Sequence, residues 1–323
     1  MVVTCPPHTP HAPGHGGRGT KEPGHPQASP PADDRANPTL EGVPATVGTR
    51  HAMPPVPRRQ YGSGVGDFTY RRIVSGAKGF FKTIGLQLTV VGEENIPLEG
   101  GAVLAINHTG YLDFVFAGIP ANMRDKRLVR FMAKDDVFTH PVSGPLMRSM
   151  SHIPVDRSAG SGSFRTAVGV LKSGELVGVF PEATMSRSLE IKEIKSGAVR
   201  MARAAKVPLI PMILFGSHRV ITYGHRDFSR GTPVYITVGA PIETTGDPEV
   251  VAETLRATMQ AMLDETIARY PDRPTSPDDA WWMPARLGGT APTLEEAAAM
   301  EAEFSAARAA RKSAAAADKE AKG

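Results

Sequence analysis

The sequence predicts an α/β fold: a single mixed sheet flanked by helices, with an N-terminal amphipathic helix and low-complexity tails. Two observations predict it. Short apolar runs have the character of buried strands. Helical stretches at residues 164–171 and 198–205 fall between those runs, and such alternation is typical of a sheet covered by helices. The expected strands are 86–91, 102–106, 129–133, 176–180, 209–215 and 234–238.

Composition divides the 323-residue chain into three parts. Residues 1–60 contain 13 Pro, 7 Gly and no aromatic residue, so they lack the apolar surface that would offset their ordering entropy. We expect a disordered tail there and a folded domain at residues 61–270. Residues 271–323 form an extension with a Trp-Trp pair at 281–282 and an Ala-rich helix from Thr293. The Trp pair either packs on the domain or lies at a lipid interface.

The first predicted helix spans residues 68–85. Its apolar residues recur at helical spacing along one face, and basic residues lie on another. A basic amphipathic helix can lie on an anionic bilayer, and the same pattern suits a helix packed on a protein core, so both interpretations stay open. The basic residues that would face the lipid are Arg71, Lys78 and Lys82.

The most clearly delimited helix begins at Asp247-Pro248. An Asp at the N-cap followed by Pro at the first helical position is a strong start signal. Apolar residues then recur at helical spacing until the chain reaches Pro271. We therefore expect a helix that ends before Pro271.

Charge and cysteine content exclude several classes of protein. Residues 61–247 carry 22 Lys and Arg against 16 Asp and Glu, which suits an anionic partner such as a membrane surface or a phosphate. Aromatic residues do not interleave with the basic ones, so nucleic acid is not expected as a partner. Cys5 is the sole cysteine, which excludes an intramolecular disulfide and cysteine-based metal sites. No apolar run approaches the roughly 20 residues of a spanning helix, and the N-terminus has no signal-peptide pattern.

The strand at 102–106 delivers a histidine into a polar turn. His108 follows this strand, and Asp113 follows five residues later at the start of a new apolar run. A strand–loop–helix layout can fold the Asp113 carboxylate back onto the imidazole. The carboxylate then fixes the tautomer and leaves the second ring nitrogen free to take a proton, as a general base acting on a hydroxyl requires.

The strand at 176–180 ends in a second polar segment. Glu182, Thr184 and Arg187 follow it, and Lys195 lies further along the same loop. Arginine supported by lysine is suited to holding a phosphate. Arg157 stands at the end of a third strand-like run.

Taken in order, these segments resemble the glycerophosphate acyltransferase superfamily, of the bacterial 1-acyl-sn-glycerol-3-phosphate acyltransferase type. The family's His-x4-Asp motif is matched by His108 and Asp113, and its strand ending in Arg resembles residues 153–157. Its Phe-Pro-Glu-Gly-Thr-Arg-Ser motif resembles residues 180–186, with Ala183 for the usual Gly and Met185 for the usual Arg. Its Val-Pro-Ile-x-Pro segment is similar to residues 207–211.

The resemblance implies transfer of a fatty acyl group from acyl-CoA or acyl carrier protein to 1-acylglycerol 3-phosphate, giving phosphatidic acid. His108, oriented by Asp113, takes the hydroxyl proton. Arg157, Glu182 and Thr184, with Arg187 or Lys195, position the glycerol phosphate. Neither a metal nor a cofactor is implied beyond the acyl thioester. Lysophosphatidic acid and an anionic membrane are the expected partners, with the enzyme cytoplasmic and peripheral on the inner face of the cell membrane.

Two kinds of alternative stay open. Because Met185 replaces the usual phosphate-binding Arg, the acceptor could instead be glycerol 3-phosphate, another lysophospholipid or a glycolipid. A non-catalytic lipid-binding protein with the same fold is an alternative of another class. The sequence gives no indication of the oligomeric state.

Overall fold

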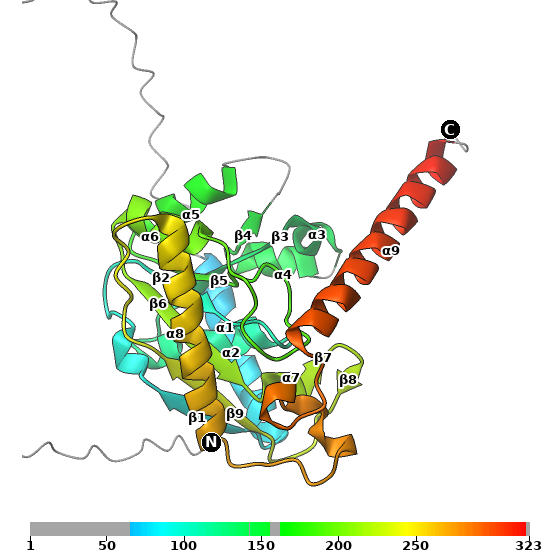
Figure 1. Ribbon diagram of the computed structural model, residues 1–323. Coiled ribbons are helices and arrows are strands. Elements are labelled where there is room, and N and C mark those ends of the chain that lie inside the picture. Colours follow the sequence, from blue (N-terminus) through cyan, green and yellow to red (C-terminus); the bar gives the residue numbers. More distant parts are fainter. Residues whose placement is uncertain (1–64, 142, 156–161, 321–323) are drawn as a thin grey trace, which may run out of the picture. The chain divides into compact units, whose positions relative to one another are not determined.

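The computed structural model describes residues 65–320, apart from residue 142 and residues 156–161 (Figure 1). The expected N-terminal tail at residues 1–60 and the candidate phosphate ligand Arg157 lie outside the described residues.

A seven-stranded mixed sheet forms the centre of the fold, as predicted. Its strands lie in the order β1-β9-β6-β2-β5-β3-β4, and every neighbouring pair is parallel except β6 and β9, which are antiparallel. A two-stranded hairpin, β7 with β8, stands apart from it. The strands are β1 (Gln87–Val91), β2 (Ala102–Ile106), β3 (Val129–Lys134), β4 (Ile153–Val155), β5 (Leu176–Val179), β6 (Leu209–Phe215), β7 (Ile221–Thr222), β8 (His225–Arg226) and β9 (Pro233–Val238).

Helices cover both faces of the sheet (Figure 1). On one face lie α1 (Val65–Thr83) and α2 (Asp113–Met123). On the other lie α5 (Gly162–Lys172), α6 (Gly197–Ala205) and α8 (Pro248–Arg269). The remaining helices are α3 (Asp135–Thr139), α4 (Ser143–Ser149), α7 (Ser217–Val220), α9 (Leu294–Glu320) and the 3₁₀ turns η1 (Glu93–Asn95), η2 (Asp278–Trp282) and η3 (Ala285–Leu287).

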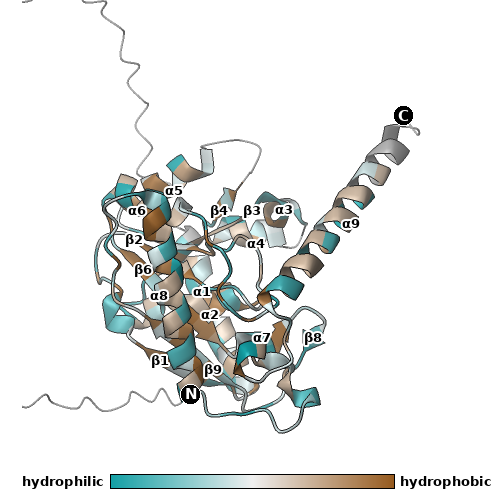
Figure 2. Ribbon diagram, viewed as in Figure 1, coloured by the Kyte–Doolittle hydropathy of each residue, from teal (hydrophilic) through white to brown (hydrophobic). Residues whose placement is uncertain are grey.

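The central strands are buried on both faces because helices pack on each side. Alternate residues of β2 point to opposite cores: Val103 and Ala105 to one, Leu104 and Ile106 to the other. Every residue of β6 is likewise buried. Figure 2 shows hydrophobic residues gathered in these strands, whereas the exposed helix α9 has mixed hydropathy. This two-sided burial explains why the strands read as continuous apolar runs.

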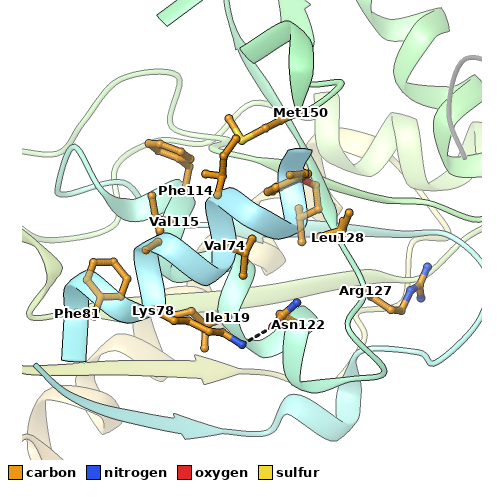
Figure 3. Close-up of a pocket in the computed structure, with 15 residues that line it drawn as sticks. Val74, Lys78, Phe81, Phe114, Val115, Ile119, Asn122, Arg127, Leu128 and Met150 are labelled. Atoms are coloured by element: carbon orange, nitrogen blue, oxygen red, sulfur yellow. Dashed lines mark hydrogen bonds between the residues drawn. The ribbon is translucent and has the colours of Figure 1, made fainter. Parts of the chain in front are cut away.

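The apolar face of α1 packs on the protein. Phe81 of α1 stacks on Phe116 of α2 with ring centres 4.7 Å apart. Figure 3 shows Val74 and Phe81 of α1 lining a pocket together with Val115 and Ile119 of α2. Lys78, half-buried, donates a hydrogen bond to Asn122 Oδ1. Of the two interpretations of this face, the structure therefore supports the core-packed one.

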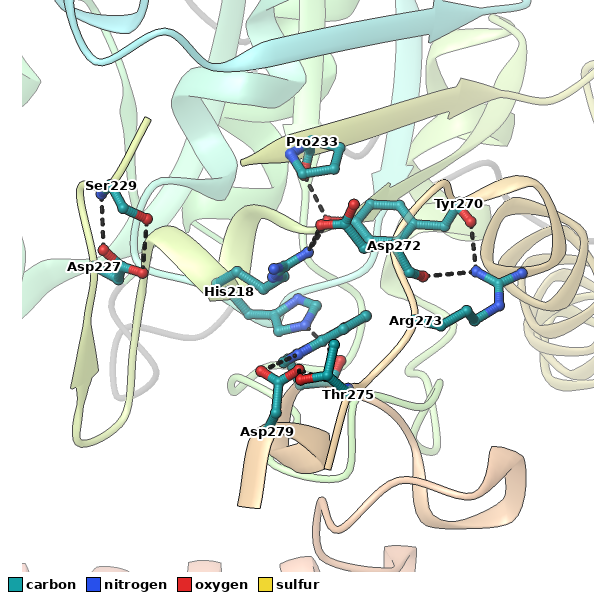
Figure 4. Close-up of polar contacts among 11 residues, drawn as sticks. His218, Asp227, Ser229, Pro233, Tyr270, Asp272, Arg273, Thr275 and Asp279 are labelled. Carbon is teal, nitrogen blue, oxygen red and sulfur yellow. Dashed lines mark hydrogen bonds and ion pairs between the residues drawn. The ribbon is translucent and has the colours of Figure 1, made fainter. Parts of the chain in front are cut away.

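The C-terminal extension folds back onto the domain. Trp282 is only 1% exposed and belongs to the same apolar core as α8, so it packs inside the protein. Figure 4 shows polar contacts where this extension begins. Tyr270 Oη donates to the Pro233 carbonyl at 2.7 Å. His218 Nε2 lies 2.9 Å from the Trp282 carbonyl, and burial lowers the pKa of His218 to about 4. The neutral imidazole therefore donates this hydrogen bond near neutral pH.

Asp247 caps α8 as expected. Its carboxylate accepts hydrogen bonds from the backbone N–H groups of Glu249 and Val250, which the first helical turn leaves without partners. The helix ends at Arg269, before Pro271. The Ala-rich segment is also helical, as α9.

Candidate active site

The candidate site lies where two parallel strands end. Strands β2 and β5 are neighbours and run the same way, so the segments after Ile106 and Val179 leave the same edge of the sheet. Loops at the carboxyl ends of parallel strands commonly form ligand sites. Asn107 fastens the first loop because its side chain donates to the Leu214 carbonyl and accepts from the Leu214 N–H on β6. The following residue, His108, is thereby held at this edge.

His108 and Asp113 form a hydrogen-bonded pair. His108 Nδ1 lies 2.9 Å from Asp113 Oδ2, and Asp113 is the first residue of α2, as the sequence predicted. The Asp113 side chain is fully buried, whereas His108 remains 24% exposed. The same oxygen of Asp113 accepts from the backbone N–H groups of Thr109 and Gly110 at 2.7 and 2.8 Å. An ionised carboxylate, which only accepts, suits a position surrounded by donors.

This arrangement selects one imidazole tautomer. Nδ1 carries the proton that it donates to Asp113, so Nε2 carries the lone pair. Among the described residues, none makes a hydrogen bond to His108 Nε2. The imidazole ring stacks on Phe180, with ring centres 4.2 Å apart, which fixes its plane. His108 is therefore equipped to accept a proton through Nε2.

Glu182 ties the two loops together. It is buried and accepts from the His108 N–H at 3.1 Å and from the Lys192 N–H at 3.2 Å. Burial raises the pKa of Glu182 to about 7, against the opposing effect of these two hydrogen bonds. Its carboxylate does not line the pocket beside His108. Its role in the structure is thus to hold the loop that carries His108.

A pocket of about 330 Å³ opens beside His108. Of the residues predicted for the site, Thr184 and Arg187 line it together with His108. Met185, which stands where the resembled family has Arg, also lines it. The complete lining is His108, Tyr111, Lys134, Ala183, Thr184, Met185, Arg187, Tyr223, Glu301, Phe304, Ser305 and Arg308.

The cations of the pocket differ partly from those expected. Lys195 is exposed and does not line the pocket, whereas Lys192 donates to Thr184 Oγ1. The Arg187 guanidinium lies over the Tyr223 ring, 3.7 Å from its centre. Tyr223 stands in the turn between β7 and β8, and no sequence pattern indicates that this turn lies at the site. Tyr223 is therefore a site residue that sequence reasoning missed, whereas Lys192 contacts the pocket wall through Thr184 without lining the pocket itself.

Ala183 occupies a backbone position typical of glycine. Its φ is 65°, in the left-handed region. The resembled family has Gly at this place in the motif. The loop therefore keeps the glycine conformation although a Cβ is present.

The described residues of the site are not accompanied by a cluster of metal-binding side chains. Within residues 65–320, outside the two gaps, no three His, Cys, Asp or Glu side chains lie close enough together to hold a metal ion. The described site consists of a His–Asp pair beside a cation-lined pocket.

The fold and the site define an α/β protein with a hydrogen-bonded His–Asp pair at a strand end. Residues 87–214 match the family model described as acyltransferase. The chain is 30% identical over 179 residues to 1-acyl-sn-glycerol-3-phosphate acyltransferase of Bacillus subtilis, a match that covers 55% of this chain and 85% of the relative. It is 25% identical to the Borreliella burgdorferi protein of the same name, over 55% of this chain and 71% of the relative.

Structural comparison supports the same fold. The crystal structure of a 1-acyl-sn-glycerophosphate acyltransferase from Thermotoga maritima matches with a TM-score of 0.53 and 22% identity, covering 64% of this chain and 83% of that one. The chain belongs to the acyltransferase family that includes the bacterial 1-acyl-sn-glycerol-3-phosphate acyltransferases. Its enzymatic class is acyl transfer.

Proposed function

We propose that this enzyme transfers a fatty acyl group from acyl-CoA or acyl carrier protein to the free hydroxyl of 1-acylglycerol 3-phosphate, giving phosphatidic acid. The observation that carries the proposal is the shared pocket of His108 and Arg187. One residue can take a hydroxyl proton and the other can hold a phosphate. The acyltransferases that this chain resembles in sequence are named for the same acceptor.

The proposed reaction has two steps. His108 Nε2 removes the acceptor's hydroxyl proton while the oxygen bonds to the carbonyl carbon of the thioester. The carbon–sulfur bond then breaks, and the leaving thiolate receives the proton from the imidazolium. Asp113 keeps the ring in the required tautomer and stabilises its positive charge, as the carboxylate does in other His–Asp pairs.

Arg187 and Lys192 supply positive charge for the acceptor phosphate. Arg187 has no ion pair within the part of the chain that the structure describes, and its guanidinium lies over the Tyr223 ring. Lys192 stands next to Thr184 in the same loop. We assign Arg157 to the same role from the motif alone.

We further propose that the outer face of α1 contacts an anionic membrane on its cytoplasmic side. Phe68 and Phe80 of this helix are 61% and 45% exposed, and the helix also exposes Arg71 and Lys82. Aromatic and basic residues together favour binding at a charged lipid surface. No helix within residues 65–320 is both long and apolar enough to span a bilayer. Loss of vesicle binding in a Phe68→Ser/Phe80→Ser variant, with activity on dispersed substrate retained, is the expected result.

Incubation of purified protein with lysophosphatidic acid and a long-chain acyl-CoA tests the reaction. We expect phosphatidic acid and free thiol in equal amounts. His108→Ala should lower the rate by at least about 10²-fold, the usual contribution of a general base. His140→Ala, at an exposed histidine outside the pocket, is the matched control.

Other outcomes discriminate among the alternatives. Thioester consumption with glycerol 3-phosphate, another lysophospholipid or a glycolipid, but not with lysophosphatidic acid, would contradict the acceptor assignment and keep acyl transfer. Lipid binding without thioester consumption for any acceptor would favour a non-catalytic protein.

A further inference from the structure

Helix α9 forms one wall of the pocket beside His108. Four of its residues line the pocket, at positions 301, 304, 305 and 308. This spacing of three, four and seven residues places them on one face of the helix. The helix lies outside residues 87–214, which match the family model. The wall is therefore an addition of this chain to the matched region.

Glu301 on this face pairs with Lys192, a cation that would otherwise be available to an anionic acceptor. Its Oε2 lies 3.0 Å from Lys192 Nζ, and the same Nζ donates to Thr184 Oγ1. Burial raises the pKa of Glu301, but hydrogen bonds from Thr184 and Lys192 outweigh burial and hold it below its ordinary value. The carboxylate is therefore ionised at neutral pH, with its charge directed into the loop that carries Thr184 and Arg187.

The other charged groups around this part of the pocket come from four elements: the loop after β5, α9, α3 and β3. Arg187 of the loop after β5 lowers the pKa of Glu301 through its charge. Arg308, two turns further along α9, pairs with Asp136 of α3. Lys134 also pairs with Asp136, at 2.6 Å. Lys134 and Arg308 already share the Asp136 carboxylate. Arg187 and Lys192 are therefore the cations that we expect an acceptor phosphate to contact.

Polar contacts, and little apolar packing, fasten this part of α9. Ala297 is the last described residue of the helix that is buried, while Phe304 is 56% exposed. Glu301 is 34% exposed in its side chain. Substitution of Glu301 therefore changes charge in the pocket without removing part of the core.

We propose that Glu301 is a specificity-determining residue, whose carboxylate competes with the acceptor's phosphate for Lys192 and so sets how strongly the pocket favours phosphate-bearing over neutral acceptors. The proposal rests on the acceptor pocket of the proposed function. A phosphomonoester must displace Glu301 from Lys192 and also approach a negative charge. A monoacylglycerol, which has the same glycerol and acyl chain without the phosphate, meets neither cost.

Glu301→Gln tests the proposal because it keeps the side-chain shape and removes the charge. Its matched control is Glu303→Gln, which removes the same charge from an exposed position of α9 outside the pocket. Equilibrium binding of lysophosphatidic acid and of monoacylglycerol is measured by calorimetry for all three proteins. KM and kcat are measured for whichever acceptor is turned over.

We expect Glu301→Gln to tighten lysophosphatidic acid binding and lower its KM by roughly tenfold, equivalent to about 1.4 kcal/mol. Monoacylglycerol binding and kcat should stay within twofold. Glu303→Gln should match the wild type for both ligands.

Three comparisons among these proteins and ligands would overturn the proposal, and so would one common absence of binding. They are weaker lysophosphatidic acid binding in Glu301→Gln, an equal change for both ligands, or an equal change in Glu303→Gln. Absence of lysophosphatidic acid binding in both wild type and Glu301→Gln would overturn it as well. If the wild type binds lysophosphatidic acid but forms no phosphatidic acid, the proposed function fails while the binding comparison still decides the role of Glu301.

Discussion

Ser217 Oγ donates a hydrogen bond of 2.6 Å to Asp113 Oδ1, the carboxylate oxygen that His108 does not contact. Ser217 is fully buried and begins α7, directly after the long strand β6. Gly216 makes this turn possible, because its φ is 91° and a Cβ there would lie 2.2 Å from the Pro233 carbonyl oxygen. The end of β6 therefore positions the carboxylate that orients the candidate base.

Ser217→Ala should reduce kcat with little effect on the KM of either substrate. A hydrogen bond to a charged group contributes about 1.5–3 kcal/mol, and loss of part of it lets the Asp113 carboxylate rotate away from His108. We expect kcat to fall roughly tenfold in steady-state assays. Thr222→Val is the control, because it removes a neighbouring hydroxyl that donates to the Thr109 carbonyl and does not contact Asp113. Equal losses of kcat in the two variants would show that Ser217 only supports the loop.

Ala183→Gly should stabilise the protein. A left-handed conformation costs an L-residue about 1–2 kcal/mol, and glycine adopts it freely at a smaller cost in unfolded-chain entropy. We expect a net gain of about 0.5–1 kcal/mol in the free energy of unfolding, measured by urea denaturation.

Ala204→Gly is the control, and we expect it to lower the free energy of unfolding where Ala183→Gly raises it. Ala204 is exposed within the right-handed helix α6, where glycine should cost about 1 kcal/mol. If both variants lose stability, the loop at Ala183 does not require its positive φ.

Glu182 should make stability depend on pH. Because the pKa of Glu182 is raised to about 7, the folded protein binds a proton between about pH 4.5 and 7 that the unfolded chain has released. Its contribution to stability is therefore fully present at low pH and declines as pH rises through 7. The free energy of unfolding of wild type, relative to Glu182→Gln, should fall by about 3 kcal/mol between pH 4.5 and 8.

Urea denaturation of both proteins across that range measures the difference. His152 and His218, whose pKa values burial lowers to about 3 and about 4, give slopes of opposite sign below pH 6.5. Both histidines are present in both proteins, so their effects cancel. Glu193→Gln, at an exposed glutamate of the same loop, is the reference variant. A difference that stays constant with pH would show that Glu182 is ionised throughout.

Much of the fold was predictable because burial leaves a direct pattern in the sequence. The two-sided burial of β2 and β6 produces continuous apolar runs, and the cap at Asp247 fixes the start of α8. The close approach of His108 to Asp113 was predictable for a local reason, since a strand, a short turn and a helix start fold the two side chains together.

Other parts depend on contacts that are distant in sequence. Lys192 and Lys195 lie three residues apart in an irregular loop, where no period decides which side chain turns toward Thr184. Tyr223 stands in a turn between two strands of two residues each, too short to leave an alternating pattern. The contact of Glu301 with Lys192 spans 109 positions and depends on how α9 docks. Such features follow from packing of the completed fold.

Tyr223→Leu should weaken binding of a phosphate-bearing acceptor. The centre of the Tyr223 ring lies 3.7 Å from the Arg187 guanidinium carbon, and both residues line the pocket. A cation–π contact contributes about 0.5–2 kcal/mol, so we expect the KM for lysophosphatidic acid to rise roughly fivefold while kcat changes little. Tyr223→Phe retains the ring and should resemble the wild type. Steady-state kinetics with monoacylglycerol, which has no phosphate for Arg187 to hold, should separate the variants by less than twofold. If Tyr223→Phe proves as defective as Tyr223→Leu, the hydroxyl of Tyr223 matters to the acceptor and the stacking of Arg187 does not.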